Sequence, residues 1–516
     1  MKSFLNKLLD YYHISLEDYL KLTKEPSIED IPTLDSFNNG KITKDLLQKH
    51  LDKNDNIAIY GDYDCDGIMA TSILVFALNK IGYKNYTYYI PSRYSDGYGI
   101  TLDFVKSCLK NNVKLIITVD NGISANEPIN FAIESGIDVI IADHHEPLSV
   151  LPNTPYVIHP FYSKNPDLIC SGGFTSFIVS TMILNEADPY LLSLAGISTI
   201  SDMMSLTGYN RDVVRLAIKI INKNKYAPII YLAQNKEIDE YIIGSLIAPK
   251  INSVGRIIED NNINKLVSFF VSDDKSLIDE LGNKINNVNE LRKNISRDVN
   301  ISLEEFKNKN AIVIKCSEKE GIIGLLANKF LNETNKLSIV FTDACEDQIL
   351  KGSARSREGI SLIELFENTS NYLLRSGGHA NAAGLSIKDS DFDNFKKAVY
   401  SYTKEKNFIT KQEEFIKISP IEVNIENYNT LFNFGPFGMD NPKPKFIIKD
   451  FPSKSIAFSK DGKHILTTLS NEAKLVMFNV KNRDVLKNTL LSLVGTFSLN
   501  EYKGYISVNF IISDIY

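Results

Sequence analysis

Between residues 56 and 142 the sequence alternates short β-branched runs with helical patterns, and this alternation constrains the fold more than any other feature. Four apolar runs, at residues 57–60, 86–90, 115–119 and 139–142, are separated by segments with helical spacing of apolar residues. Strands that alternate with helices form βαβ units, and such units build a mostly parallel, doubly wound sheet. We therefore expect an α/β fold in this part of the chain.

Acidic residues follow three of these four runs. Residues 61–67 (GDYDCDG) follow the first run, residues 120–122 (DNG) the third and residues 143–146 (DHHE) the fourth. Ligands of an open parallel sheet bind outside the carboxyl ends of its strands. Like charges in such a place repel each other unless a cation lies between them. Carboxylates with one or two imidazoles suit manganese or magnesium better than zinc, so the pattern predicts a divalent-metal site.

The first acidic segment taken alone has two other interpretations. It resembles the start of a calcium-binding EF-hand loop, but the Glu expected at the twelfth loop position, counted from Asp62, is Ile73. It could also be an acidic turn without a ligand. Three acidic strand ends in one predicted sheet, together with the His144-His145 pair, favour the metal site.

Length and composition favour a soluble protein of several domains. A chain of 516 residues predicts three or four domains. Its 43% hydrophobic and 23% charged residues, with a mean hydropathy of -0.12, are typical of soluble globular proteins. No signal peptide or apolar membrane span is recognisable, so we expect the cytoplasm. The five cysteines include no C-x-x-C pair, which predicts buried thiols rather than disulfides or a zinc ribbon.

Three further segments follow the first sheet. Apolar residues from Leu277 to Phe306 recur at spacings of three and four, which predicts a long helix that joins two lobes; a coiled-coil dimerisation helix is the alternative. Residues 311–314 open a second, smaller α/β segment. Residues 417–516 are rich in short strands and carry 12 Lys and Arg against nine Asp and Glu, although the whole chain has a net charge of -6. This predicts a small basic β-barrel.

At this point the motifs carry a resemblance. Asp62-Tyr63-Asp64-Cys65-Asp66-Gly67, residues 120–122, residues 143–145 and residues 201–206 are similar to the four motifs of the DHH phosphoesterase superfamily, in order. Within that superfamily, further segments resemble the RecJ family of bacterial single-strand-specific exonucleases. These segments are residues 91–94, 97–99, 249–256, 351–356, 377–384 and 435–442.

The resemblance implies an architecture. It predicts a DHH catalytic lobe with a parallel sheet, a long connecting helix, a smaller α/β DHH-associated lobe and a C-terminal OB-fold β-barrel. One departure is visible: where the family usually has Trp-His before a helix start, the chain has Glu318-Lys319-Glu320, so no role for that His is carried over. The expected parts are an N-terminal helical segment (1–55), the DHH domain (56–270), the connecting helix (271–308), the DHH-associated domain (309–405) and the OB-fold (415–516).

The resemblance also implies a function. It predicts a metal-dependent exonuclease that degrades single-stranded DNA from 5′ to 3′ and releases 5′-mononucleotides in DNA repair and recombination. Besides single-stranded DNA, the partners that it suggests are a helicase or a single-strand-binding protein; we expect a monomer and no membrane partner. The alternatives are a phosphodiesterase for very short oligonucleotides or cyclic dinucleotides, and a catalytically silent scaffold of DHH ancestry.

Site residues follow from the matched motifs. We expect His145 to contact the scissile phosphate, with support of its neighbour as the alternative, and Asp143 to orient His144. By resemblance, two manganese or magnesium ions would be held by Asp62, Asp64, Asp66, Asp120, His144 and Asp202, and the catalytic residues would be Asp64, Asp120, His144 and His145.

Substrate contacts are expected from arginines, because four of the ten in the chain fall in or beside the matched motifs: Arg93, Arg256, Arg355 and Arg357. This placement favours phosphate contact for the first three. Arg presents a planar fork that grips phosphate, and Lys does not replace it there. The predicted substrate-binding residues are Arg93, Arg256, Ser353, Arg355 and His379; a buried core histidine is the alternative for His379. The aromatic candidates for base stacking in the barrel are Phe446, Phe478, Phe497, Tyr502 and Tyr505.

Overall fold

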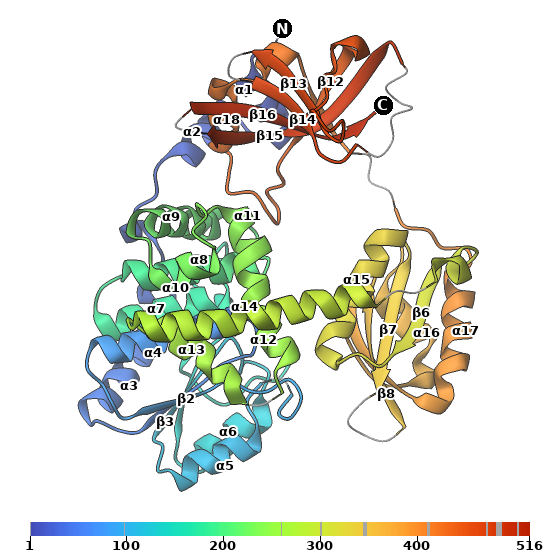
Figure 1. Ribbon diagram of the computed structural model, residues 1–516. Helices are drawn as coiled ribbons and strands as arrows, with labels where there is room; N and C mark the ends of the chain where they lie inside the picture. Colours follow the sequence, from blue (N-terminus) through green and yellow to red (C-terminus); the bar gives the residue numbers. More distant parts are fainter. Residues whose placement is uncertain are drawn as a thin grey trace. The chain divides into compact units, whose positions relative to one another are not determined.

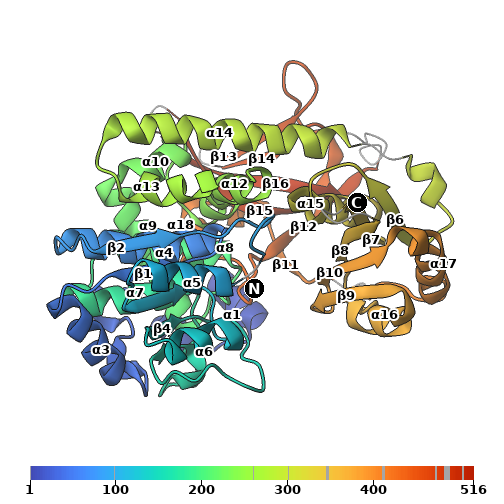
Figure 2. The same cartoon turned by 90° about the horizontal axis from the view of Figure 1, so that it is seen from below.

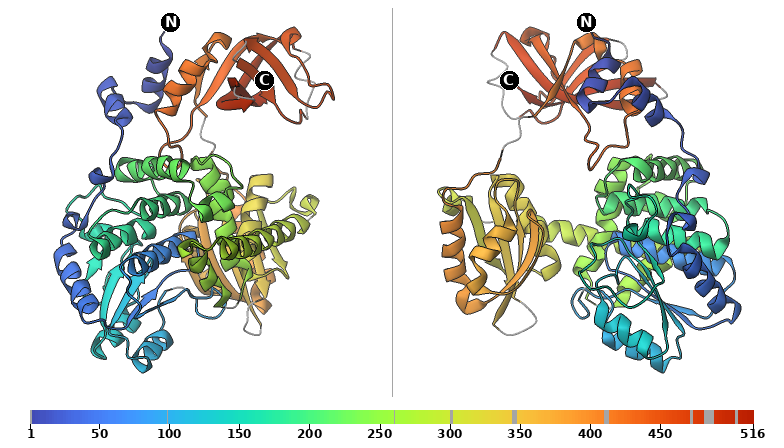
Figure 3. Two further views of the ribbon diagram at one scale, coloured as in Figure 1. Left: turned by 60° about the vertical axis from the view of Figure 1, so that its left-hand side comes forward. Right: turned by 180° about the vertical axis from the view of Figure 1, so that it is seen from behind.

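The computed structural model describes residues 2–97, 99–259, 261–299, 302–343, 348–409, 413–470, 473–480, 488–502 and 505–516. The chain divides into two compact units, which Figures 1 and 3 show from several sides. The larger unit comprises Ile28–Met204 and Gly208–Thr410. The smaller unit comprises Met1–Ser27, Ser205–Thr207 and Lys411–Tyr516.

The larger unit begins with a five-stranded parallel sheet whose strand order is β2-β1-β3-β4-β5. Figure 2 labels β1, β2 and β4 of this sheet. The parallel fold predicted from the sequence is confirmed. Every residue of β1 and β3 is buried, as expected for strands with both faces covered by helices. The strands are β1 (Ile57–Tyr60), β2 (Tyr86–Tyr89), β3 (Leu115–Val119), β4 (Asp138–Ala142) and β5 (Val157–Ile158).

Helices cover both faces of this sheet. On one face, α4 and α7 pack in the main core with Ile59 and Ile117; on the other face, α5 and α6 pack with Tyr60 and Ile116. The helices of this lobe are α3 (Gly40–Asp52), α4 (Cys65–Lys80), α5 (Leu102–Lys110), α6 (Asn126–Glu134), α7 (Gly172–Leu184), α8 (Pro189–Ser201), α9 (Gly208–Asn224), α10 (Ala227–Leu232), α11 (Glu240–Ile242), α12 (Ala248–Ile257) and α13 (Lys265–Val271).

A long helix, α14 (Lys275–Asp298), connects this lobe to a second one (Figure 1). Its first half buries Ile278 and Ile285 in the main core, and Ile295 in its second half packs against the core of the second lobe. The apolar stripe is therefore covered by the same chain, which favours a connecting helix over a coiled coil. The helix ends earlier than the predicted stripe, because Asp298 has a low helix propensity and Val299 is extended.

The second lobe holds a mixed five-stranded sheet with the order β6-β7-β8-β10-β9. Helix α15 packs on one face with Phe330, and α16 and α17 pack on the other with Phe366 and Phe395. The elements are β6 (Ala311–Cys316), α15 (Glu320–Thr334), β7 (Leu337–Asp343), β8 (Ile349–Arg355), α16 (Leu362–Asn368), β9 (Leu373–Gly378), β10 (Ala382–Lys388) and α17 (Phe392–Thr403).

The smaller unit is a six-stranded sheet with the order β11-β12-β15-β16-β14-β13, together with helices α1, α2 and α18. Its core includes Phe4 and Leu8 of α1 and Tyr19 of α2, so the first 27 residues belong here, whereas residues 28–55 belong to the larger unit. This division was not predicted. The elements are α1 (Phe4–Tyr12), α2 (Leu16–Thr23), β11 (Phe415–Ile418), α18 (Ile425–Phe432), β12 (Lys445–Pro452), β13 (Ile465–Ser470), β14 (Ala473–Met477), β15 (Leu490–Tyr502) and β16 (Tyr505–Ile515).

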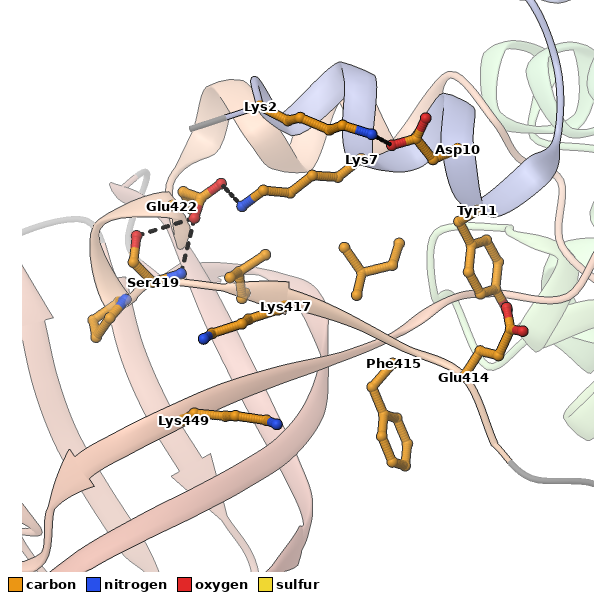
Figure 4. A pocket seen from close by; sticks show the side chains of 13 residues that line it. Lys2, Lys7, Asp10, Tyr11, Glu414, Phe415, Lys417, Ser419, Glu422 and Lys449 are labelled. Carbon is orange, nitrogen blue, oxygen red and sulfur yellow. Dashed lines mark hydrogen bonds and ion pairs between the residues drawn. The ribbon is translucent and has the colours of Figure 1, made fainter.

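An ion pair connects α1 to the short 3-10 turn that follows β11. Lys7 Nζ lies 2.6 Å from Glu422 Oε1, and the other oxygen of Glu422 accepts a hydrogen bond from Ser419 N–H at 2.8 Å (Figure 4). Between α1 and β11 a groove of about 700 Å³ remains, and the ammonium groups of Lys417 and Lys449 lie along it.

The burial of the cysteines and the hydropathy of the helices were also predicted. Cys65, Cys108 and Cys170 are buried as expected, whereas Cys316 is half-buried; Cys345 lies outside the described residues. Among the helices that the structure describes, none is both long and apolar enough to cross a membrane.

Candidate metal centre and anion pocket

Neighbouring strand ends bring carboxylates to one edge of the parallel sheet. β1 is followed by Asp62 and Asp64, and Asp64 caps α4 by accepting a hydrogen bond from Gly67 N–H at 3.1 Å. β3, which pairs with β1, is followed by Asp120. The backbone of Asp120 has a φ of 60°, in the left-handed region where Asp is found more often than most residues. The local chain therefore turns sharply at the point where the carboxylate is presented.

His144 lies among these acids. Its Nε2 is 3.1 Å from Asp120 Oδ1, 3.5 Å from Asp66 Oδ2 and 3.6 Å from Asp202 Oδ2. Asp202 follows the last residue of α8, so a helix end adds one more carboxylate to those that follow the strands. Ligand atoms within 4.8 Å of one another form two separate triads, Asp62-Asp64-Asp120 and Asp66-His144-Asp202, and an overlapping one, Asp120-His144-His145.

Asp66 is held by the start of helix α7. Its two carboxylate oxygens accept hydrogen bonds from Gly172 N–H at 2.8 Å and Gly173 N–H at 2.7 Å, and Ser198 Oγ is a further donor. Asp120 also comes close to this helix start, and only Gly fits at position 172 because a Cβ there would lie 2.5 Å from Asp120. The positive end of the helix thus faces the acidic centre. The sequence analysis did not identify Gly172, Gly173 or Ser198, although a Ser-Gly-Gly helix start was a usable signal.

Asp143 orients His145, which corrects the expectation that it orients the His144 ring. Asp143 Oδ1 lies 2.8 Å from His145 Nδ1, whereas its contact with His144 is only through the backbone N–H, at 2.7 Å. The reason is that the His144 ring points into the acidic centre. Buried His159 supports the same turn, with Nε2 2.8 Å from the carbonyl oxygen of His145. His159 carried no recognisable sequence pattern.

A second site, the anion pocket, lies next to this centre. It has a volume of about 380 Å³ and is lined by four of the five predicted substrate-binding residues, together with Lys351 and Arg375. Arg93 lies over the Tyr63 ring at 4.3 Å, and Tyr63 stands between Asp62 and Asp64, so the pocket adjoins the acidic centre. The four predicted residues in the pocket are Arg93, Arg256, Ser353 and Arg355.

Arg256 and Arg355 of the pocket donate hydrogen bonds to neutral groups. Arg256 Nη1 donates to the Gly321 carbonyl at 3.2 Å, and Arg355 Nη1 donates to Ser353 Oγ at 3.0 Å and to the Ala354 carbonyl at 2.8 Å. Within the described residues, no carboxylate forms an ion pair with Arg93, Arg256 or Arg355. Glu320 also lines the pocket, but it pairs with Lys351, so the three arginines remain without a carboxylate partner among the described residues. Such a group of arginines suits a phosphate or another anion.

His379 is not brought to this pocket. It is exposed in the turn between β9 and β10, where its N–H donates to Ala382 O at 2.9 Å, so it is not a core histidine either. At the point where the sequence departs from the family, Glu320 pairs with Lys351 at 2.8 Å and Lys319 pairs with Glu259 at 2.6 Å. Glu259 precedes α14 in the sequence and Lys319 follows it, so this ion pair connects the two segments that α14 separates.

Comparison with known proteins decides the family. Three family models match in chain order: the DHH family, N-terminal domain at residues 56–200, the DHHA1 domain at residues 308–405 and the RecJ OB domain at residues 416–514. The chain belongs to the RecJ family. The single-stranded-DNA-specific exonuclease RecJ of Bacillus subtilis is 30% identical over 500 residues, which are 92% of this chain and 63% of that protein. The RecJ of Haemophilus influenzae is 26% identical, covering 91% of this chain and 89% of its own.

Solved RecJ structures share the fold. RecJ from Thermus thermophilus in complex with Mn²⁺ matches with a TM-score of 0.82 at 22% identity, over 99% of this chain and 76% of that one. An exonuclease RecJ bound to manganese matches with a TM-score of 0.61 at 27% identity, over 74% of this chain and 96% of that one. The predicted architecture, including the OB-fold, is therefore confirmed.

In this RecJ-family chain the acidic centre is strained by its own charge. Burial, and next the charge of Asp64, raise the pKa of Asp62 to about 8, and burial with Asp66 and Asp64 raises that of Asp202 to about 8. Burial and four neighbouring carboxylates hold the pKa of Asp120 well above its usual range. Burial alone would lower the pKa of His145, but the hydrogen bond to Asp143 raises it to about 9.

The donor set fits divalent cations. Asp62 Oδ1 is buried and has no hydrogen-bond partner among the described residues, which is costly for a carboxylate oxygen unless a ligand binds it. Oxygen atoms with one or two imidazole nitrogens are the ligands that manganese and magnesium accept. Two cations near the two triads would relieve the repulsion that raises these pKa values.

Without metal, the stability of this RecJ-family protein is expected to fall as pH rises. The pKa of Asp62 and Asp202 is about 8 in the folded state and about 4 in an unfolded chain. Between these values the folded state binds more protons, so the free energy of unfolding falls as pH rises through the window. His145, with its raised pKa, acts in the same direction between about 6.5 and 9. The lowered pKa of His144 opposes it.

Thermal unfolding at pH 5.5 and pH 8, in chelator and in Mn²⁺, measures this effect. The midpoint in chelator should be higher at pH 5.5, Mn²⁺ should remove the difference, and Asp202→Asn should flatten it in chelator. If the midpoint in chelator rises with pH equally in the wild type and in Asp202→Asn, these carboxylates are not protonated in the folded state.

The aromatic candidates of the OB domain divide into two groups. Phe446 and Phe497 are fully buried in the core, which corrects their assignment as stacking candidates. Both pack in the core of the smaller unit with Phe4 and Phe510. Phe478 and Tyr505 are 62% and 81% exposed. The side chain of Tyr502 lies outside the described part of the structure, as does Tyr98 of the residue 97–99 motif.

Proposed function

We propose that this chain is a metal-dependent exonuclease that degrades single-stranded DNA from the 5′ end and releases 5′-mononucleotides in DNA repair and recombination. The observation that carries the proposal is the pair of adjoining sites in one unit: two triads of metal-type ligands beside a pocket of arginines without carboxylate partners among the described residues. The B. subtilis RecJ, 30% identical, is a single-stranded-DNA-specific exonuclease. The chain spans 63% of that relative's length, so its activity and substrate are proposed here by similarity.

The proposal assigns two divalent ions, manganese or magnesium, to the acidic centre. When bound, they would activate a water molecule as the nucleophile and neutralise charge on the phosphate during the reaction. Asp120 and His144 lie where the triads overlap, which suits them to hold both ions at the required spacing. The ligands in this proposal are Asp62, Asp64, Asp66, Asp120, His144 and Asp202, and the catalytic residues are Asp64, Asp120, His144 and His145.

His145 and the residues of the anion pocket would orient the substrate. Asp143 holds Nδ1 of His145, and the raised pKa favours the imidazolium, which would donate a hydrogen bond to a phosphate oxygen. The anion pocket would hold the 5′-terminal phosphate, so that the adjoining diester reaches the metal centre. We assign this pocket to Arg93, Arg256, Ser353 and Arg355; His379 would act on the strand outside the pocket. Because the pocket holds only about 380 Å³, it would admit a strand end and exclude duplex.

Other parts of the proposal concern the surroundings of the enzyme. We infer that it works as a monomer in the cytoplasm, with a helicase or a single-strand-binding protein supplying its strand.

A phosphodiesterase for dinucleotides is the alternative function. The match to the OB domain model argues against it, because such a small substrate would not need a strand-binding domain. Digestion of a single-stranded 30-mer, the same 30-mer in a blunt duplex and a dinucleotide tests the choice. We expect rapid loss of the single strand alone; preferential cleavage of the dinucleotide would overturn the proposal.

The exposed aromatic residues of the OB domain are expected to bind the strand. Replacing both Phe478 and Tyr505 with Ala should weaken the binding of a 30-mer, because base stacking is worth about 1–3 kcal/mol per base. A substrate of four nucleotides should be affected much less. Phe432→Ala, at a 61% exposed position on α18, is the matched control. Fluorescence anisotropy in Ca²⁺ measures the affinities, and equal losses in the double variant and the control would contradict the assignment.

A further inference from the structure

Arg292 of the connecting helix lies beside the anion pocket and belongs to none of the matched motifs. Its neighbour Arg256, in the last turn of α12, is half-buried, and the pKa of Arg256 is lowered to about 10 by burial first and then by neighbouring arginines. Among the arginines that lower it, Arg93 has the largest effect and Arg292 the next, ahead of Arg355, which itself lines the pocket. The guanidinium of Arg292 is therefore close to that of Arg256.

The packing of α14 explains how Arg292 comes to this place. Val288, Arg292 and Ile295 recur at spacings of four and three, so they share one face of the helix. Val288 and Ile295 pack in the cluster that also contains Ile257, which follows Arg256, and Ile322, which follows Gly321. Because its two neighbours on the helix face meet this cluster, Arg292 lies on the side of α14 that faces the segment in which Arg256 donates to the Gly321 carbonyl.

Within the described part of the chain, the guanidinium groups here form no ion pair with a carboxylate, although the charge of Asp64 acts on Arg256 and that of Glu290 on Arg292. The Nε atoms of Arg292 and Arg93 are both buried and make no hydrogen bond there. No described carboxylate forms an ion pair with either of them or with Arg256, and the nearby carboxylate of Glu320 is engaged by Lys351 at 2.8 Å. Partly buried cations that lie together repel one another, and a bound anion would offset this repulsion.

We propose that Arg292 binds the same anion as Arg256, and that the connecting helix is thereby part of the terminal-phosphate site. This inference rests on the proposed function of the pocket and adds to it a residue outside the two lobes. Since the ends of α14 pack in the cores of both lobes, a phosphate held by Arg292 fixes the helix to α12 and to the start of α15. Arg292 is thus a specificity-determining residue for strands that carry a 5′-phosphate.

The test compares variants of one helix in the full chain. Arg292→Ala and Arg292→Lys are measured with Arg297→Ala, an exposed arginine on the same helix, as the matched control. The first readout is the ratio of kcat/KM on 5′-phosphorylated and 5′-hydroxyl strands. Arg292→Ala should lower the ratio by about 10- to 100-fold, as expected for the loss of charged hydrogen bonds, Arg292→Lys should lower it less, and Arg297→Ala should leave it unchanged.

The second readout needs no catalysis. Inorganic phosphate should raise the thermal midpoint of the wild type and of Arg297→Ala in chelator, and should raise that of the two Arg292 variants less. If Arg292→Ala keeps the wild-type ratio while Arg355→Ala lowers it, this inference is overturned and the proposed pocket is not. A wild type that does not distinguish the two strands overturns the proposed pocket itself. If Arg292→Ala does not fold, Arg292→Lys decides the matter by the same two readouts, and an unchanged ratio and midpoint shift in that variant count against the inference.

Discussion

Replacing Asp120 with Asn should abolish nearly all exonuclease activity, with a loss of roughly 10³-fold or more. Asp120 Oδ1 lies 3.1 Å from His144 Nε2, and Asp120 contributes an oxygen to one metal-ligand triad and to the overlapping one. An amide oxygen carries no charge, so the variant would lose an anionic ligand that belongs to two of the triads that would hold the metal ions. Asn tolerates the φ of 60° at this position, so the local backbone should survive.

The same substitution should not unfold the protein. Burial and like charges raise the pKa of Asp120, so removing its charge relieves repulsion in the metal-free state. Single-turnover cleavage in Mn²⁺ and thermal unfolding in chelator measure the two effects, and Asp103→Asn, an exposed carboxylate on α5, is the control. Near wild-type turnover of Asp120→Asn in a folded state would contradict the metal assignment.

Arg355→Ala is expected to cost a large factor on 5′-phosphorylated strands and little on 5′-hydroxyl strands. Arg355 Nη1 donates to Ser353 Oγ and to the Ala354 carbonyl, and a Cβ at Gly324 would lie only 3.1 Å from the guanidinium. A terminal phosphate carries up to two charges, and removing one partner of a desolvated charge pair costs about 2–5 kcal/mol. That corresponds to roughly 30- to 5,000-fold in kcat/KM.

Arg355→Lys should recover only part of this loss, because an ammonium keeps the charge without the planar fork. Arg357→Ala is the matched control, since Arg357 is bound to the side chains of Asn332 and Asn335. If the wild type degrades both strands equally, or if Arg355→Ala loses equally on both, the pocket does not read the 5′ end.

Much of the fold and of the metal centre could be predicted because parallel sheets follow a simple rule. The carboxyl ends of β1, β3 and β4 meet at one edge, so Asp64, Asp120 and His144 had to come close together wherever the helices lay. Asp202 is different: a helix end delivers it, and only its resemblance to a family motif pointed to it. The roles of these residues, and the boundaries expected for the domains, remain predictions.

What the sequence did not predict depends on tertiary packing. The Asp143 carboxylate reaches the ring of His145 but only the backbone N–H of His144, although the centroids of the two rings lie 4.5 Å apart. No residue pattern encodes which of two adjacent histidines is held in this way. Phe446 and Phe497 face the barrel core, and only the register of the strands distinguishes them from exposed Phe478. Residues 1–27 join the OB domain through Phe4, Leu8 and Tyr19, contacts that cross almost the whole length of the chain.

The central claim is that the acidic centre cleaves single strands from the 5′ end, and product analysis of end-labelled DNA tests it most directly. A single-stranded 30-mer carrying a radiolabelled 5′-phosphate, or a 3′ fluorescent label, is incubated with the full chain in Mn²⁺ or in chelator. The account predicts that the 5′ label appears at once as mononucleotide, that the 3′-labelled strand shortens progressively, and that chelator stops both. Early release of the 3′ label as mononucleotide, or undiminished cleavage in chelator, would contradict it.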